Sequence, residues 1–112
     1  MRWPWQRRRL GALEVETLPP YTVRVVGVDR REVDRVVSQV MDAADSAGAQ
    51  NTVTLDTLTR IRPSEAKKLG FPSEFFGKMT FTREIMVSGD EGSAIAAIGR
   101  IVPGSLVRIA IE

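Results

Sequence analysis

The sequence predicts a small α+β domain in which strands and helices alternate along the chain. Two kinds of periodicity support this prediction: β-branched residues alternate over 21–28, and apolar residues recur at helical spacing over 30–47. The 112 residues, 43% of them apolar and 27% charged, suffice for one hydrophobic core and fit an ordinary globular protein. Segments with one or the other period follow in the second half of the chain.

The first two predicted elements are a strand over 21–28 and a helix over 30–47. The strand segment YTVRVVGV is rich in β-branched residues, which favour strands. Asp29 then stands at the N-cap with Glu32 three residues later, a variant of the capping box, and Gly48 suits the end of the helix. The apolar stripe of this amphipathic helix consists of Val33, Val36, Val37, Val40, Met41, Ala44 and Ala47.

The second half of the chain adds two strands, a short helix and a closing strand over 105–111. Residues 52–62 predict a strand whose alternation changes phase near Leu58, where a β-bulge would explain the change. Residues 79–88 predict a strand, and Asp90 in the following turn is suited to cap a helix. The apolar face of this strand is Met79, Phe81, Ile85 and Val87, and the short helix is marked by Ile95, Ile98, Ile101 and Val102.

The predicted order is therefore strand, helix, strand, strand, helix, strand. This order suits a ferredoxin-like βαββαβ fold, a four-stranded antiparallel sheet with two helices on one face. Short right-handed connections leave few other arrangements. We divide the chain into an extended arm and linker, residues 1–20, and a ferredoxin-like domain, residues 21–112.

The excess positive charge of the chain lies on the arm. Residues 1–20 carry four arginines and two glutamates, whereas residues 21–112 carry twelve basic and twelve acidic residues. Residues 1–9 of the arm show neither a helical nor a strand period, so we expect this segment to be disordered alone. It would bind nucleic-acid phosphates, a membrane interface or a neighbouring subunit. The residues expected to make these contacts are Arg2, Trp3, Trp5, Arg7, Arg8 and Arg9.

The chain contains no cysteine and no histidine, which excludes several kinds of catalytic site. Ser-His-Asp and Cys-His catalysis, Cys-based metal sites and histidine metal sites all need residues that are absent. We expect a non-enzymatic protein without a cofactor. No apolar run is long enough to cross a membrane, and we expect the protein in the cytoplasm or within an assembled particle.

A segment of sixteen residues, 63–78, separates the second and third predicted strands and is far longer than a tight hairpin needs. The fold places it at the same edge as the helix start, which carries Arg30, Arg31 and Arg35. Basic and aromatic residues together suit phosphate contacts and base stacking. The aromatic residues equally suit a mini-core that pins the loop to the sheet. The segment holds Lys67, Lys68, Phe71, Phe75, Phe76 and Lys78.

Several short segments resemble the family of ribosomal small-subunit protein ten. The matching pieces are VRVVGVDRREVD, AGAQ, LTRI and VPGSLVRIAIE. The resemblance implies the βαββαβ topology and, more distantly, RNA binding. The family's proline-rich segment is absent, and NTVTLDTLT stands in its place. A second likeness, through VVGVDRREV and AGAQ, is to ACT regulatory domains, although Arg31-Glu32 stands where their amino-acid-binding turn has Pro-Gly.

These observations predict a non-catalytic binding module for an anionic partner, RNA more than DNA. The contacts would come from the arm, from the three arginines of the helix start and from the basic and aromatic residues of 63–78. An alternative is a protein-assembly subunit, an accessory of a larger complex or a virion, in which the arm and loop contact neighbours and the chain forms a homo-oligomer. An ACT-like small-molecule sensor is a more distant alternative.

Overall fold

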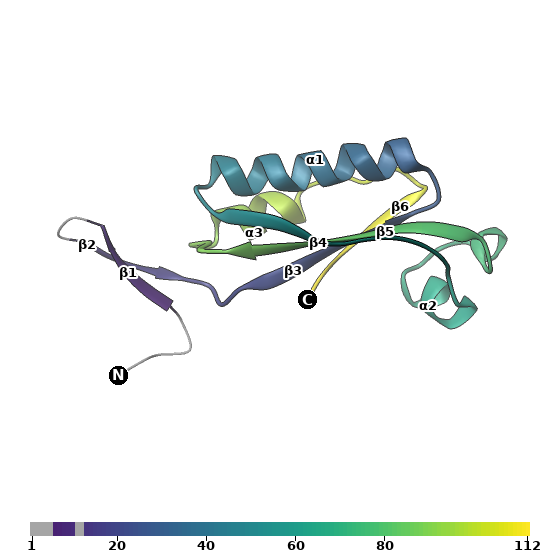
Figure 1. The fold of residues 1–112 in the computed structure, drawn as a ribbon, viewed down its shortest axis with the longest axis horizontal. Helices are drawn as coiled ribbons and strands as arrows, with labels where there is room; N and C mark the ends of the chain where they lie inside the picture. Colours follow the sequence, from purple (N-terminus) through teal and green to yellow (C-terminus); the bar gives the residue numbers. More distant parts are fainter. Residues whose placement is uncertain (1–5, 11–12) are drawn as a thin grey trace.

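The computed structural model describes residues 6–10 and 13–112, with side chains from Glu16 onward, and confirms the α+β fold. Its main elements are β3 (Tyr21–Gly27), α1 (Arg30–Ser46), β4 (Gln50–Arg60), β5 (Met79–Ser88), α3 (Ser93–Gly99) and β6 (Val107–Ile111). The four strands form one antiparallel sheet in the order β4-β5-β3-β6, and α1 and α3 cover one of its faces (Figure 1). This is the ferredoxin-like arrangement that the order of elements predicts.

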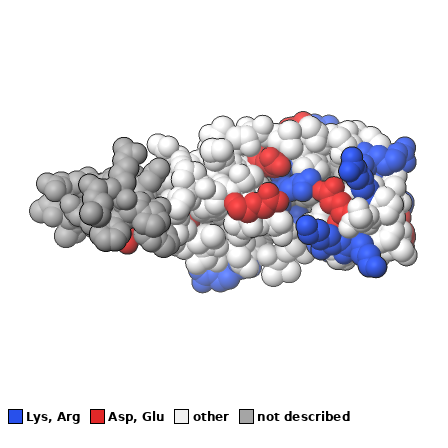
Figure 2. Space-filling model, turned by 90° about the horizontal axis from the view of Figure 1, so that it is seen from below, with Lys and Arg blue, Asp and Glu red and all other residues white. Residues whose placement is uncertain are grey.

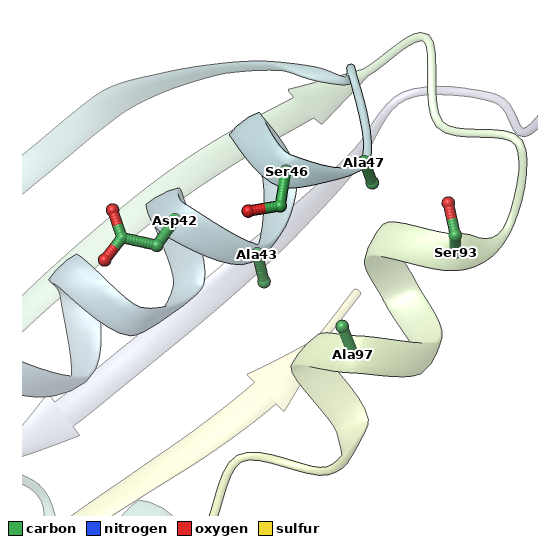
Figure 3. A pocket seen from close by; sticks show the side chains of 6 residues that line it. All are labelled: Asp42, Ala43, Ser46, Ala47, Ser93 and Ala97. Carbon is green, nitrogen blue, oxygen red and sulfur yellow. The ribbon is translucent and has the colours of Figure 1, made fainter.

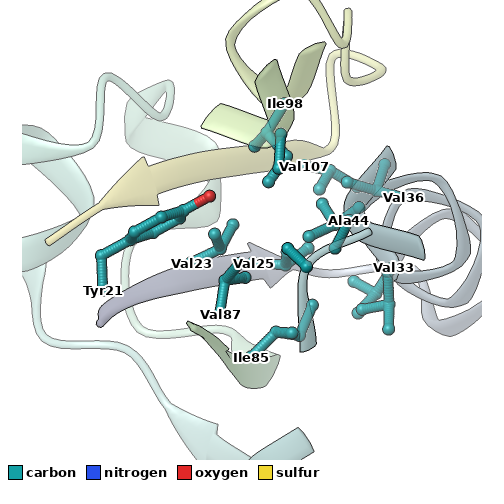
Figure 4. Packing of buried hydrophobic residues seen from close by; sticks show 14 residues of the cluster. Tyr21, Val23, Val25, Val33, Val36, Ala44, Ile85, Val87, Ile98 and Val107 are labelled. Carbon is teal, nitrogen blue, oxygen red and sulfur yellow. The ribbon is translucent and has the colours of Figure 1, made fainter. Parts of the chain in front are cut away.

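The main core lies between the sheet and its two helices (Figure 4). Val23 and Val25 of β3 point to this side and pack with Val33 and Val36 of α1, and all four side chains are fully buried. Burying a valine side chain contributes roughly 1.5–3 kcal/mol, so this cluster supplies much of the stability. The helical stripe predicted from the sequence therefore faces the sheet.

The start of α1 has the predicted N-cap but not the complete capping box. Asp29 is extended, and its Oδ1 accepts a hydrogen bond of 2.8 Å from the backbone N–H of Arg31. Glu32 does not reach back to the cap. Its Oε2 instead pairs with Nη2 of Arg35 at 2.8 Å.

The start of α3 is capped by Asp90, which is only 1% exposed, as the sequence predicts. Its carboxylate accepts hydrogen bonds from the Tyr21 hydroxyl at 2.6 Å and from the N–H groups of Gly92, Ala94 and Ile95 at 2.8, 3.0 and 2.9 Å. Burial alone would raise the pKa of Asp90, but these hydrogen bonds hold that pKa below its ordinary value. Burial, together with the hydrogen bond to Asp90, raises the pKa of Tyr21.

The bulge predicted near Leu58 is present in β4 but lies earlier. The register of β4 against β5 shifts between Val53 and Leu55. Leu58 itself is paired regularly with Phe81 and is exposed. Because β4 is an edge strand with mostly exposed side chains, the pattern of apolar and polar residues carries little information about its phase.

Two apolar residues assigned to the main core lie outside it. Met79 is exposed at the start of β5, where Thr80 and Thr82 on the opposite face are buried instead. Val102 is 83% exposed because α3 ends at Gly99 and Val102 belongs to the following loop.

The extended N-terminal arm is present, but its described part has regular structure that we did not predict. β1 (Gln6–Leu10) and β2 (Leu13–Thr17) form an antiparallel hairpin. The segment LEVET of β2 alternates with period two, a signal that our prediction missed. Thr17 is buried at the base of the hairpin, and the N–H of Leu18 donates to the carbonyl oxygen of Asp90 at 2.6 Å. The predictions for Arg2, Trp3 and Trp5 lie outside the described residues, and only the backbone is described for Arg7, Arg8 and Arg9.

The segment between β4 and β5 folds into a second, smaller core on the sheet face opposite α1 (Figure 1). It contains α2 (Pro63–Lys68) and the 3-10 turn η1 (Ser73–Phe75), which begin at Pro63-Ser64 and Pro72-Ser73. The buried members of this second core are Val26, Ile61, Ala66, Phe71 and Phe75. The segment is thus anchored on the sheet.

Candidate anion-binding surface

Basic side chains gather on and around α2. Between residues 60 and 78 the sequence has five basic and two acidic residues. Figure 2 views the sheet face opposite α1 and shows basic side chains toward one end of this face, with acidic ones nearer its centre. We call the group of Arg60, Arg62, Lys67, Lys68 and Lys78 the basic end; all five side chains are exposed.

The phenylalanines of this segment serve the second core and are not displayed to a partner. Phe71 and Phe75 are 5% and 8% exposed, and their rings meet edge to face with centroids 5.6 Å apart. The guanidinium carbon of Arg108 lies 4.9 Å from the Phe71 centroid, and Lys78 Nζ lies 5.8 Å from the Phe75 centroid. Base stacking on Phe71 or Phe75 is therefore excluded in this conformation, and Phe76 is half-buried beside them.

We expected the arginines at the start of α1 to lie beside the basic residues of 63–78, but the structure separates them. They lie at the same end of the sheet as α2 but on its opposite face (Figure 1). Arg30 Nε is 3.9 Å from Asp34 Oδ2, and Arg35 is paired with Glu32. The sheet therefore separates the two groups of basic residues that we predicted to share one edge. In the group on α1, Arg30 and Arg35 are paired with carboxylates of the same helix. The side chain of Arg31 has no ion pair with any residue that the structure describes.

Arg83 of β5 is also paired with carboxylates. Arg83, which is 12% exposed, bridges Asp34 of α1 and Asp56 of β4 with two contacts of 2.7 Å. Burial alone would lower the pKa of Arg83, but these two carboxylates raise it above its ordinary value. Arg83 therefore stabilises the packing of α1 on the sheet.

The basic end, in contrast, keeps most of its charge available. Within residues 16–112, whose side chains are described, Arg62, Lys67 and Lys68 form no ion pair. Arg60 donates from Nη1 to the carbonyl oxygen of Gly77 at 2.5 Å, which orients its side chain without neutralising it. Exposed cations that have no carboxylate partner are available to bind anionic groups such as phosphates.

A pocket of about 570 Å³ opens between α2 and the strands β3 and β6. Arg24 of β3 forms one wall, where its Nη2 pairs with Glu65 Oε1 of α2 at 2.7 Å. Its Nε is buried and has no hydrogen-bond partner among the described residues, because Glu84 Oε1 is 4.0 Å away. The pocket is lined by Arg24, Arg62, Ser64, Glu65, Lys68, Leu69, Ala110 and Glu112.

Sequence reasoning missed Arg24, Arg62 and Glu112 as members of one site. Arg24 and Ala110 are neighbours across the β3–β6 ladder although 86 positions separate them in the sequence. The local signal for this site is the cluster of basic residues just before and within α2. Arg62 was not counted in that cluster because we assigned it to the preceding strand.

A second hollow of about 460 Å³ lies between the end of α1 and α3 (Figure 3). Its walls are mostly small side chains, including Ala43, Ala47 and Ala97, with Asp42 at one side. It has no cation and one carboxylate, so it does not extend the basic end.

The described residues offer no arrangement of three or more carboxylates that could hold a metal ion. The carboxylates of Asp29 and Asp90 both cap helices. No helix in this part of the chain is long and apolar enough to cross a membrane.

Comparison with known proteins assigns no family. A scan against protein-family models gives no match, and a search of curated proteins finds none that is similar. The resemblances to ribosomal small-subunit protein ten and to ACT domains thus stay predictions, and the function rests on the geometry of the chain itself.

Proposed function

We propose that this chain is a non-catalytic binding module that holds single-stranded RNA through the basic end. The observation that carries the proposal is that cations without carboxylate partners gather around α2, whereas most cations elsewhere in the described chain are paired. Arg24, Arg30, Arg35 and Arg83 are paired with carboxylates, whereas Arg62, Lys67 and Lys68 are exposed without such partners among the described residues. Cations of the second kind contact phosphates at little desolvation cost.

The shape of the surface favours a single strand over duplex DNA. The six residues of α2 form a helix only about 9 Å long, and its buried face is packed on the sheet. A short helix packed in this way is poorly placed to enter a major groove, the route by which helices recognise duplex DNA. The predicted resemblance to ribosomal small-subunit protein ten favours RNA over single-stranded DNA.

Replacing Arg62, Lys67 and Lys68 by alanine together should weaken binding of a short oligouridine by about 100-fold near 0.1 M salt. Each lost phosphate contact also lowers the steepness with which affinity falls as salt rises. For three contacts, the slope of log K against log salt should decrease by about two. Fluorescence anisotropy at several salt concentrations measures both quantities.

The matched control is the triple alanine variant of Arg30, Arg31 and Arg35, which removes the same charge from the opposite face of the sheet. We expect it to keep the wild-type salt slope. Equal losses in the two triple variants would show that net charge, not the basic end, governs binding. An absence of binding by the wild type at low salt would overturn the proposal.

A second candidate function, subunit assembly, is supported by the N-terminal hairpin. Within the described residues β1 and β2 pair only with each other, and hairpins of two strands are marginal in water without further packing. A neighbouring copy would supply that packing. Light scattering should then give a mass above the monomer for the full chain and a monomer mass after deletion of 1–17. A monomer mass for both would argue against homo-oligomer assembly.

A further inference from the structure

The pocket beside α2 is built by one small residue in the sheet. On the face opposite α1, Ala110 of β6 lies directly across from Arg24 of β3, so a methyl group stands next to a long side chain. Leu69, just after α2, adds a second apolar surface. The resulting volume of about 570 Å³ lies within the range of small-ligand sites and has room for a nucleotide.

The polar lining of this pocket contains both cations and carboxylates. Arg62 and Lys68 provide cations without carboxylate partners in the described chain, and Ser64 provides a hydroxyl. Glu65 is already committed to Arg24. Glu112 supplies the second carboxylate of the lining, and backbone hydrogen bonds of 3.0 and 2.8 Å to Thr22 hold this residue against β3.

We propose that this pocket takes one unpaired nucleotide of the bound strand and prefers guanine to uracil. The inference rests on the proposed function and deepens it. The base lies against Ala110 and Leu69, its donor groups face Glu112, and its phosphate lies at Arg62 and Lys68. Unpaired bases that are turned out of a strand are the usual target of sequence-specific RNA recognition.

The preference follows from the number of donors on each base. Guanine carries two adjacent N–H donors that can meet both oxygens of one carboxylate. Uracil has a single N–H between two carbonyl oxygens, and those oxygens repel a carboxylate. Cytosine and adenine, with one amino group each, should bind with intermediate strength. A paired donor–acceptor contact of this kind is expected to favour the matching base by about tenfold.

The test compares a short oligouridine with the same strand carrying one central guanine, by fluorescence anisotropy. The wild type should bind the guanine strand about tenfold more tightly. Ala110→Leu fills the floor of the pocket without changing charge, so it should abolish the preference and leave the salt slope unchanged. Thr52→Leu, an exposed position on β4 away from the pocket, is the matched control and should keep the preference.

A second pair of variants tests the carboxylate. Glu112→Gln and Glu74→Gln each remove one negative charge, but only Glu112 lines the pocket, since Glu74 lies on η1. Both should raise overall affinity slightly, and Glu112→Gln alone should bring the two strands to similar affinity. Equal binding of both strands by the wild type, or a preference that survives Ala110→Leu, would overturn the inference while leaving the proposed function intact. No binding of either strand would overturn both.

Discussion

Replacing Asp90 by asparagine should destabilise the domain by about 2–4 kcal/mol, because several buried donors lose a charged acceptor at once. The Tyr21 hydroxyl and the N–H groups of Gly92, Ala94 and Ile95 all donate to this carboxylate. Asparagine has the same shape, so the loss reports hydrogen bonding and charge, not packing. Urea unfolding at neutral pH measures the difference in the free energy of unfolding.

The effect should also depend on pH in a defined direction. Burial acts to raise the pKa of Asp90, but its hydrogen bonds hold it below the ordinary value, so the unfolded chain binds the proton more readily. The stabilisation is complete above the unfolded pKa of about 3.9 and is lost as pH falls through the lower folded value. The gap between the wild type and Asp90→Asn should therefore close in acid.

Tyr21→Phe provides the matched comparison for this prediction. It removes one of the four donors to Asp90 and leaves the carboxylate charged. Its cost should be smaller, about 1 kcal/mol. A gap between the wild type and Asp90→Asn that stays constant throughout the acid range would contradict a stabilising role for the charge.

Replacing Phe71 by alanine should cost roughly 3–5 kcal/mol locally and release the segment that carries the basic end. Phe71 packs on Phe75 in the second core, and its N–H donates to the carbonyl oxygen of Ala66 at 3.0 Å. Because this core is separated from the main core by the sheet, its loss need not unfold the whole domain. Hydrogen exchange should show loss of protection within 63–78 at amides such as those of Phe71 and Lys78, and RNA affinity should fall although no charge has changed.

The control for this prediction is Phe81→Ala, which makes the same truncation against the main core. We expect it to lower the global free energy of unfolding without selective exposure of 63–78. If Phe71→Ala left the protection of this segment intact, the second core would not be what positions the basic end.

The elements that could be predicted from the sequence are those specified by neighbours in the chain. The valines of α1 repeat at helical spacing, and Asp29 and Asp90 stand directly before the helices that they cap. Each signal is complete within a few residues. Because its signals lie within the helix and its cap, α1 was predicted to within one residue of its end. The bulge was misplaced because the exposed edge strand β4 has no such local signal.

The candidate site could be predicted only in part, because distance along the chain says little about which face of a sheet a segment covers. Lys67 and Lys68 share a segment with the phenylalanines, yet the former are exposed and Phe71 is buried. The start of α1, which carries Arg30, lies at the same end of the sheet but on the other face (Figure 1). Glu112 meets α2 only through the pairing of β6 with β3, which no local pattern encodes.

The second core also has a consequence for the order in which the chain folds. This core joins distant parts of the chain. Val26 comes from β3, Phe71 and Phe75 come from the segment between β4 and β5, and the partly buried Leu106 before β6 packs against the cluster. Contacts between such distant parts of a chain form slowly, after the strands that hold them have paired. During synthesis the basic end would therefore acquire its final shape only when Leu106 has left the ribosome. We expect a partner that requires this shape to bind chains that include Leu106 and not chains that end before it.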